Sequence, residues 1–159
     1  MNNYLFQLGY RLGEQLQQRN WRIATAESCT GGGVSAAITA IPGSSSWFEY
    51  GIVSYANSAK QKLLGVSAAT LEHEGAVSEA VVIEMALGIL ALAQADIAVA
   101  ISGIAGPDGG SLEKPVGTVW FAWVTASKKI KTELKKFDGD RGAIQKQAVV
   151  FALEGALAF

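Results

Sequence analysis

Apolar side chains recur along this chain with two different periods, which separate the expected helices from the expected strands. Between residues 4 and 18, Leu5, Leu8, Leu12 and Leu16 fall at the spacing of an amphipathic helix, with Gln, Arg and Glu residues between them. Residues 96–101 instead form a nearly unbroken apolar run, as buried strands do. The chain therefore contains both kinds of element.

Applied to the whole chain, the pattern predicts helices and strands in alternation. The expected helices cover residues 4–18, 34–41, 57–64, 67–74, 78–94 and a last one within 139–159. The expected strands cover 21–26, 50–56, 96–101, 117–125 and 130–137, the last two forming a hairpin. Asn57 is the expected N-cap of its helix. We predict an α/β fold, a single-domain three-layer α/β/α sandwich with a mixed sheet, spanning residues 1–159.

Composition and charge narrow the class of protein. Half of the 159 residues are hydrophobic, which is enough for one sizeable core. Thirteen basic and fourteen acidic residues give a net charge of −1, so there is no basic field for nucleic acid or an anionic membrane. The N-terminus lacks the features of a signal peptide, and no apolar run reaches the roughly 18 residues that span a bilayer. We expect a cytoplasmic protein that binds neither nucleic acid nor membrane.

Two adjacent residues are candidate nucleophiles. Ser28 lies between an expected strand and a helix that is entered through three glycines, where backbone N–H groups can hold an oxyanion. A serine in such a turn is also the ordinary residue for capping a helix. Cys29 is the rival, because a thiolate is the better nucleophile, although free cysteines mostly pack in cores. The residues alone leave this choice open.

A serine nucleophile needs a base, and two side chains compete for that role. His73, the one histidine, lies between two glutamates in an expected helix, which is typical of an exposed side chain. Lys60 follows the second expected strand, where desolvation can hold its amine neutral, with Tyr55 nearby. Most lysines on helices are simply solvated. Four residues separate Tyr55 from Lys60, not the three of the Tyr-x-x-x-Lys pair of short-chain dehydrogenases, and no G-x-G-x-x-G motif follows the first strand. These two observations exclude a nicotinamide-dependent oxidoreductase.

Two further motifs suit an anion. The loop at 102–110 is rich in glycine, whose backbone N–H groups can approach a ligand closely, but it has no Walker G-K-[ST] sequence. Arg141 lies near the start of the last helix, a natural phosphate clamp. A long turn and a solvated arginine are the ordinary alternatives. Asp108, Asp138 and Asp140 match no known metal-binding spacing, so we expect no metal and activity that survives chelators.

Taken together, these motifs point to one family. The chain contains AESCTGG at 26–32, PGSSSWFEYGIVSYANSAK at 42–60, GAVSE at 75–79, SGIAGPDGGSLEKPVGTVW at 102–120 and GDR at 139–141. This combination, which extends over nearly the whole chain, resembles the CinA C-terminal domain family of nicotinamide-nucleotide amidohydrolases. The resemblance implies hydrolysis of nicotinamide mononucleotide to nicotinate mononucleotide and ammonia. It also implies a Ser-Lys mechanism with no metal or organic cofactor, and a homodimer.

The resemblance assigns roles to individual residues. Ser28 is the expected nucleophile, Lys60 the general base and Tyr55 the partner of the lysine. The residues expected to bind substrate are Thr30, Gly31, Gly32, Ser44, Ser45, Ser102, Gly103, Gly106 and Arg141. Two alternatives stay open from the residues: a nucleotide-binding regulatory module without catalysis, and an amidase that acts on another pyridine carboxamide.

Overall fold

The computed structural model describes residues 2–159, and its elements follow the expected order. The helices are α1 (Asn3–Arg19), α2 (Gly33–Thr39), α3 (Asn57–Leu64), α4 (Ala68–Glu74), α5 (Glu79–Ala93), α6 (Arg141–Leu157) and the short 3₁₀ helix η1 (Ser44–Ser46). The strands are β1 (Ile23–Glu27), β2 (Phe48–Val53), β3 (Ile97–Gly103), β4 (Thr118–Thr125) and β5 (Ile130–Lys136). Expecting Asn57 as an N-cap was wrong by one residue: α3 is capped by the backbone of Ala56, and Asn57 is its first helical residue.

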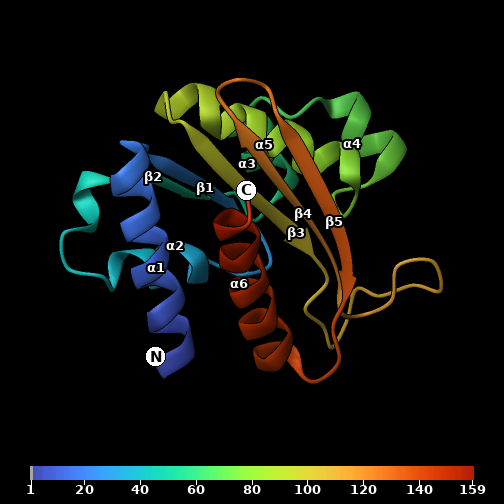
Figure 1. Cartoon of the computed structure of the whole chain (residues 1–159). Helices are drawn as coiled ribbons and strands as arrows, with labels where there is room; N and C mark the ends of the chain where they lie inside the picture. The colour runs from blue at the N-terminus through green and yellow to red at the C-terminus, as the bar shows by residue number, and fades with distance from the viewer. Residues whose placement is uncertain (1) are drawn as a thin grey trace.

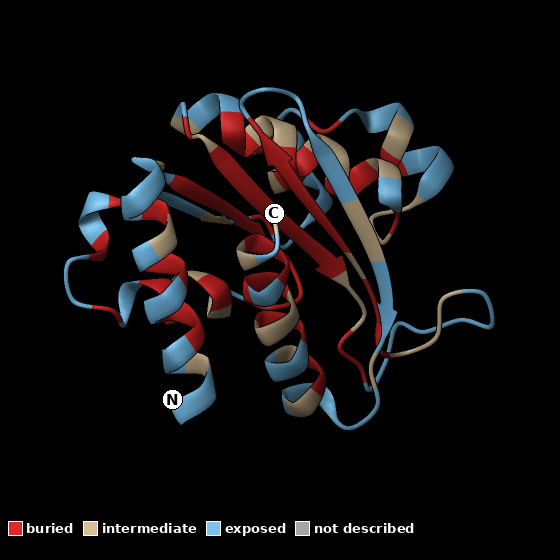
Figure 2. Ribbon diagram, viewed as in Figure 1, coloured by how far each residue is buried: buried red, intermediate tan, exposed pale blue. Residues whose placement is uncertain are grey.

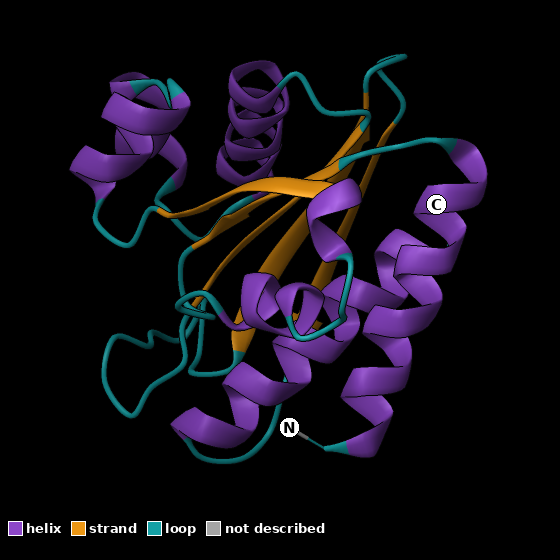
Figure 3. Ribbon diagram, turned by 90° about the vertical axis from the view of Figure 1, so that its left-hand side faces the viewer, coloured by secondary structure: helices purple, strands orange, loops and turns teal. Residues whose placement is uncertain are grey.

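The five strands form one mixed sheet, which confirms the predicted fold class. Their order is β2-β1-β3-β4-β5; β1 is parallel to β2 and β3, whereas β4 is antiparallel to β3 and β5. Helices α1, α2 and α6 cover one face of the sheet and α3, α4 and α5 the other, so that the sheet lies between two helical layers (Figures 1 and 3). Within residues 2–159, no helix is both long and apolar enough to cross a membrane.

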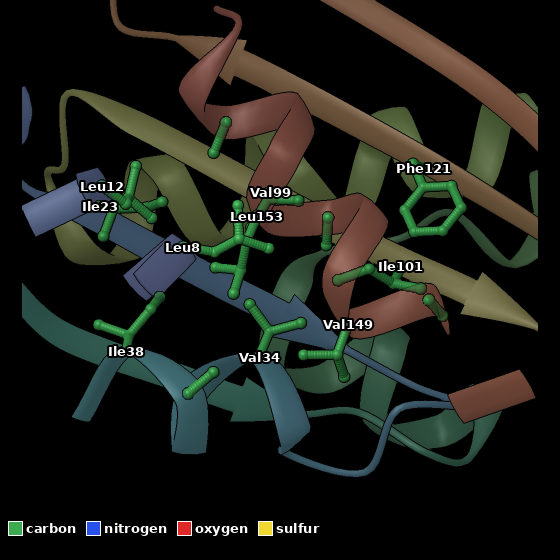
Figure 4. Close-up of a cluster of buried hydrophobic side chains, with 14 of the residues drawn as sticks. Leu8, Leu12, Ile23, Val34, Ile38, Val99, Ile101, Phe121, Val149 and Leu153 are labelled. Atoms are coloured by element: carbon green, nitrogen blue, oxygen red, sulfur yellow. The ribbon is translucent and has the colours of Figure 1, made fainter. Parts of the chain in front are cut away.

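The two faces of the sheet carry side chains of very different size. Because successive strand residues point to opposite faces, each strand contributes to both layers of the core. The face toward α1, α2 and α6 holds bulky residues, among them Ile23, Val99, Ile101 and Phe121 (Figure 4). The face toward α5 is lined mainly by Ala24, Ala26, Ala98, Ala100 and Ala122. The inner strands are buried on both faces (Figure 2), and α5 lies close to the sheet because methyl groups take little space.

The bulky face includes a tight contact between α6 and Trp123. The Trp123 side chain is fully buried, and its indole N–H donates to the Ala152 carbonyl at 3.0 Å. A methyl group at Gly155 would overlap the indole ring. Gly155→Ala is therefore expected to lower the free energy of unfolding by about 1–3 kcal/mol, despite the higher helix propensity of alanine.

Urea denaturation measures this effect, and Gly142→Ala in the same helix is the control. A methyl group at Gly142 meets nothing closer than 3.7 Å. Equal stability of the Gly155→Ala protein and the wild type would contradict the close packing of α6 on Trp123.

Candidate active site

Ser28 is the first residue after β1, at the edge of the sheet where the parallel strands end. Its backbone N–H donates to the Ile101 carbonyl of β3 at 3.0 Å, so the sheet itself holds the residue in place. The neighbouring strand β2 ends at Val53, which pairs with Glu27. This carboxyl edge of parallel strands is where α/β folds bind ligands.

Lys60 reaches Ser28 from α3. Its side chain is only 1% exposed, and its Nζ lies 3.0 Å from Ser28 Oγ, 2.9 Å from the Ser54 carbonyl oxygen and 3.2 Å from the Tyr55 carbonyl oxygen. Burial lowers the pKa of Lys60 below its ordinary value, and the Coulombic influence of Cys29 opposes this only in part. Folding therefore shifts the balance toward the neutral amine, relative to a lysine in water.

The three oxygens around Nζ suit a base. A neutral amine has two N–H bonds and one lone pair. The carbonyls of Ser54 and Tyr55 can accept both N–H bonds, since a carbonyl cannot donate. The lone pair then faces Ser28 Oγ, which can donate its proton. The arrangement orients the amine as an acceptor for the serine hydroxyl.

Cys29 lies in a different environment from Ser28. It packs in the core on the side of α1, α2 and α6, whereas Ser28 meets Lys60 from α3 on the other side. Burial raises the pKa of the Cys29 thiol to about 12. Almost none of it is thiolate at neutral pH, and a thiol is a poor nucleophile. This separates the two candidates that the residues alone left nearly even.

The glycine turn after Ser28 offers a different set of N–H groups from the one expected. Gly31 and Gly32 have φ of +58° and +99°, a region that glycine tolerates. The Gly31 N–H donates to the Ser28 carbonyl at 3.0 Å, so it is not free to hold an oxyanion, contrary to the expectation. The N–H groups of Cys29, Thr30 and Gly32 have no acceptor within residues 2–159. These three are the available donors.

Arg141, the first residue of α6, joins two loops of the site. Its Nη1 donates to the Gly106 carbonyl at 2.6 Å and its Nη2 to the Tyr55 hydroxyl at 2.9 Å. The Tyr55 ring, 60% exposed, thus contacts the arginine, and Tyr55 reaches Lys60 through its backbone carbonyl. One turn further along α6, Gln145 donates to the Cys29 carbonyl at 3.0 Å, which holds the helix start against the serine turn.

Other expected substrate ligands are divided between the two ends of the sheet. Ser102 and Gly103 end β3 beside Ser28, but the buried Ser102 hydroxyl donates to the Ala76 carbonyl at 2.8 Å. Ser44 and Ser45 lie in η1, which leads into the start of β2, and the Ile23 N–H donates to the Trp47 carbonyl there. Parallel β1 and β2 run from this end toward Ser28. Within one chain, Ser44 and Ser45 are therefore at the opposite edge from the site.

The remaining titratable candidates lie outside the cluster. His73 is exposed in the last turn of α4. Asp140 caps α6 by accepting from the Ala143 N–H at 2.9 Å. Across residues 2–159 there is no group of three or more His, Cys, Asp and Glu side chains that could hold a metal ion.

Sequence reasoning missed Glu27, a fully buried carboxylate directly before Ser28. It accepts hydrogen bonds from Thr30, Val34 and Ser35. The one signal in the sequence is an acidic residue that ends an otherwise apolar strand. The carbonyl of Ser54, a ligand of Lys60, left no signal, because any residue has a carbonyl.

The profile of the CinA C-terminal domain matches residues 6–159. This chain belongs to the CinA C-terminal domain family. The match begins within α1 and includes all later elements, so the clustered residues Ser28, Lys60 and Arg141 all lie within the CinA domain.

Related CinA proteins include enzymes named for an activity. Nicotinamide-nucleotide amidohydrolase PncC of Enterobacter agglomerans is 56% identical over 153 residues, 96% of this chain and 93% of that protein. The enzyme of the same name from Pseudomonas putida is 53% identical and covers 94% of this chain and 93% of its own length. The crystal structure of the competence/damage-inducible protein CihA from Agrobacterium tumefaciens has a TM-score of 0.96 at 39% identity, covering 99% of this chain and 96% of that chain.

Proposed function

We propose that this CinA domain hydrolyses the carboxamide of nicotinamide mononucleotide to give nicotinate mononucleotide and ammonia. Relatives that are 56% and 53% identical to it are named nicotinamide-nucleotide amidohydrolase. The observation that carries the proposal is the buried 3.0 Å contact between Lys60 Nζ and Ser28 Oγ. Hydrolysis of a stable amide needs a nucleophile in contact with a base, and this pair supplies both.

In the first half of the proposed reaction, the neutral amine of Lys60 takes the proton of Ser28 Oγ as this oxygen attacks the carboxamide carbon. The N–H groups of Cys29, Thr30 and Gly32 are the donors available to the oxyanion of the tetrahedral intermediate. The Lys60 ammonium then gives its proton to the leaving nitrogen. Ammonia departs, and the nicotinoyl group stays on Ser28 as an ester.

In the second half, water attacks that ester. Lys60, neutral again, takes a proton from the water, and the resulting intermediate expels Ser28 Oγ, which recovers its proton from the lysine. The products are nicotinate mononucleotide and the starting enzyme. No step in this sequence needs a metal or an organic cofactor, since the same amine gains and loses one proton in each half.

Arg141 is the proposed ligand of the substrate phosphate. It uses two of its five N–H donors on Gly106 and Tyr55, which leaves three for an anion. We expect Arg141→Ala to raise KM for nicotinamide mononucleotide about 10- to 100-fold, the loss of one charge-assisted contact, with a smaller change in kcat. Free nicotinamide is expected to be a far poorer substrate for the wild type.

Steady-state kinetics on both substrates check this assignment. Lys146→Ala removes a positive charge from the exposed side of the same helix and is the control. If free nicotinamide were turned over as fast as nicotinamide mononucleotide, binding of the phosphate would not contribute to the reaction, and the role proposed for Arg141 would be wrong.

A homodimer is also part of the proposal, with β2 as the strand that supports it. Both edge strands of the sheet have one unpaired side. β5 carries Lys131, Lys135 and Lys136, whose charges blunt its edge. β2 exposes Tyr50 and Val53 and has no lysine, whereas β5 exposes Ile130 and Leu134 beside its lysines. Light scattering after gel filtration measures the mass, and a monomer at all concentrations would remove the dimer from the proposal.

We further propose that residues 1–159 act as one domain and work in the cytoplasm, where the single thiol stays reduced.

The decisive experiment for the proposed activity incubates the purified protein with nicotinamide mononucleotide and measures both ammonia and nicotinate mononucleotide. A panel that adds nicotinamide and other pyridine carboxamides separates an amidase of different specificity. Tight nucleotide binding without ammonia release would instead indicate a regulatory module.

A further inference from the structure

Glu27 occupies an unusual place at the start of α2. The helix has Gly32 as its N-cap residue, so no side chain there can bind the first free backbone N–H groups. Glu27 does this from the end of β1. Its Oε1 accepts from the Val34 N–H and its Oε2 from the Ser35 N–H, both at 2.9 Å. These are the second and third residues of α2, the amides that an N-cap side chain normally binds.

The same carboxylate also holds the turn that carries Ser28. The Thr30 hydroxyl donates to Oε1 at 2.6 Å, and the Ser35 hydroxyl donates to Oε2 at 2.8 Å. The Glu27 backbone pairs with both neighbouring strands, and its carbonyl accepts from the Ser54 N–H at 2.8 Å. The Ser54 carbonyl in turn binds Lys60. One residue is therefore bonded to the turn of the nucleophile, to α2 and to the residue that holds the base.

We infer that Glu27 is a positioning residue for Ser28: its side-chain oxygens take over the capping of α2 and so keep the turn amides free for the reaction. A side-chain cap at position 32 would have stood in the turn itself, beside the Cys29, Thr30 and Gly32 N–H groups that have no acceptor within residues 2–159. With the cap supplied from β1, position 32 stays a glycine with its φ of +99°. This inference concerns the same site and rests on the proposed function.

All four groups that bind the Glu27 carboxylate are donors, and this makes a sharp test. A carboxylate only accepts, whereas a glutamine amide has the same shape but one accepting and one donating end. Whichever way the amide of the Glu27→Gln variant turns, its NH₂ group meets the N–H of either Val34 or Ser35. A hydroxyl can rotate to accept, but a backbone N–H cannot. Glu27→Gln therefore leaves one buried N–H without an acceptor and moves the turn.

The experiment compares Glu27→Gln with Glu84→Gln as the matched control. Glu84 is half-buried and also accepts a backbone N–H, that of Ser67 at 2.8 Å before α4, far from the Ser28 turn in the sequence. We expect Glu27→Gln to lower kcat about 100-fold with KM changed little, because a small displacement of the reacting groups costs that much. Glu84→Gln is expected to keep kcat, even where its melting temperature falls.

A second measurement does not depend on the substrate. A fluorophosphonate reacts with an activated serine, and mass spectrometry shows whether Ser28 is labelled. If wild type is labelled at Ser28 but releases no ammonia from nicotinamide mononucleotide, the proposed function fails while the inference stays testable. Slower labelling of folded Glu27→Gln supports the inference. The inference is overturned if Glu27→Gln leaves both the labelling rate of Ser28 and kcat unchanged. It is also overturned if the variant raises only KM.

Should Glu27→Gln fail to fold, Thr30→Val decides the question, because it removes only the bond between the carboxylate and the turn. We expect Ser28 in this variant to be labelled about tenfold more slowly, the loss of one positioning contact. Labelling at the wild-type rate would overturn the inference.

Discussion

Replacing Ser28 with alanine is expected to lower kcat/KM for nicotinamide mononucleotide by roughly 10⁴-fold or more, as loss of the nucleophile does in other serine hydrolases. The reason is that no other group within residues 2–159 contacts Lys60 as a proton donor: its remaining partners are the carbonyls of Ser54 and Tyr55. A coupled ammonia assay measures the rate, and mass spectrometry of a quenched wild-type reaction should find the acyl group on the peptide that contains Ser28.

Cys29→Ala is the matched control, one residue away. It is expected to keep most of the activity, because the pKa of this thiol is raised to about 12 and its sulfur packs in the core. Iodoacetamide should for the same reason leave the folded enzyme active at pH 8. If Cys29→Ala were inactive and Ser28→Ala active, the protein would be a cysteine amidase.

Replacing Lys60 with methionine or arginine is expected to lower kcat by about 10²–10⁴-fold, the usual contribution of a general base. Methionine cannot accept a proton, and arginine stays protonated. Lys62→Met, on the exposed side of α3, should leave kcat unchanged. The double variant Ser28→Ala/Lys60→Met should be little worse than Ser28→Ala alone, since the two groups act as a unit. Near wild-type kcat in Lys60→Met would make His73 the next base to test.

The lowered pKa of Lys60 also predicts two pH profiles. kcat/KM should rise with pH through an apparent pKa below the value of about 10.4 for a free lysine. Stability should rise over the same window, because the unfolded chain binds a proton there that the folded lysine does not. The raised pKa of Cys29 acts in the opposite direction at high pH and itself depends on the charge of Lys60, so the proteins with and without Lys60→Met are compared in a Cys29→Ala background. The difference between their stability curves isolates Lys60, and a flat difference would contradict the shift.

The fold was predictable because the pattern of apolar residues is strong. Helical spacing identified α1, and the continuous apolar run of β3 indicated a buried strand. The ends of the elements were harder: β2 ends at Val53 rather than residue 56, since its pairing with β1 stops where β1 ends. Such limits depend on a partner strand that is distant in the sequence.

The site was predictable only in part, for a related reason. Ser28 and Lys60 stand in recognisable motifs, and the structure brings them together. The roles of Glu27 and of the Gly31 amide depend on which donor meets which acceptor after folding. The spacing of residues along the chain does not predict those hydrogen-bond pairs. Ser44 lay in a matching motif, yet the direction of β2 takes it to the other edge of the sheet.

The unequal faces of the sheet also govern how the sequence can diverge. On the bulky side, a gain in volume at Ile101 can be matched by a loss at a neighbour, so substitutions there can accumulate as compensating pairs. On the side lined by alanines, a gain in volume cannot be matched in this way, because the neighbouring side chains are already single methyl groups. Growth at Ala98 or Ala100 would push α5 outward, and α3, which packs on α5 and carries Lys60, would move with it. Evolutionary change on that side is therefore expected to be slow and confined to the smallest side chains, although neither alanine bonds to Ser28 or Lys60.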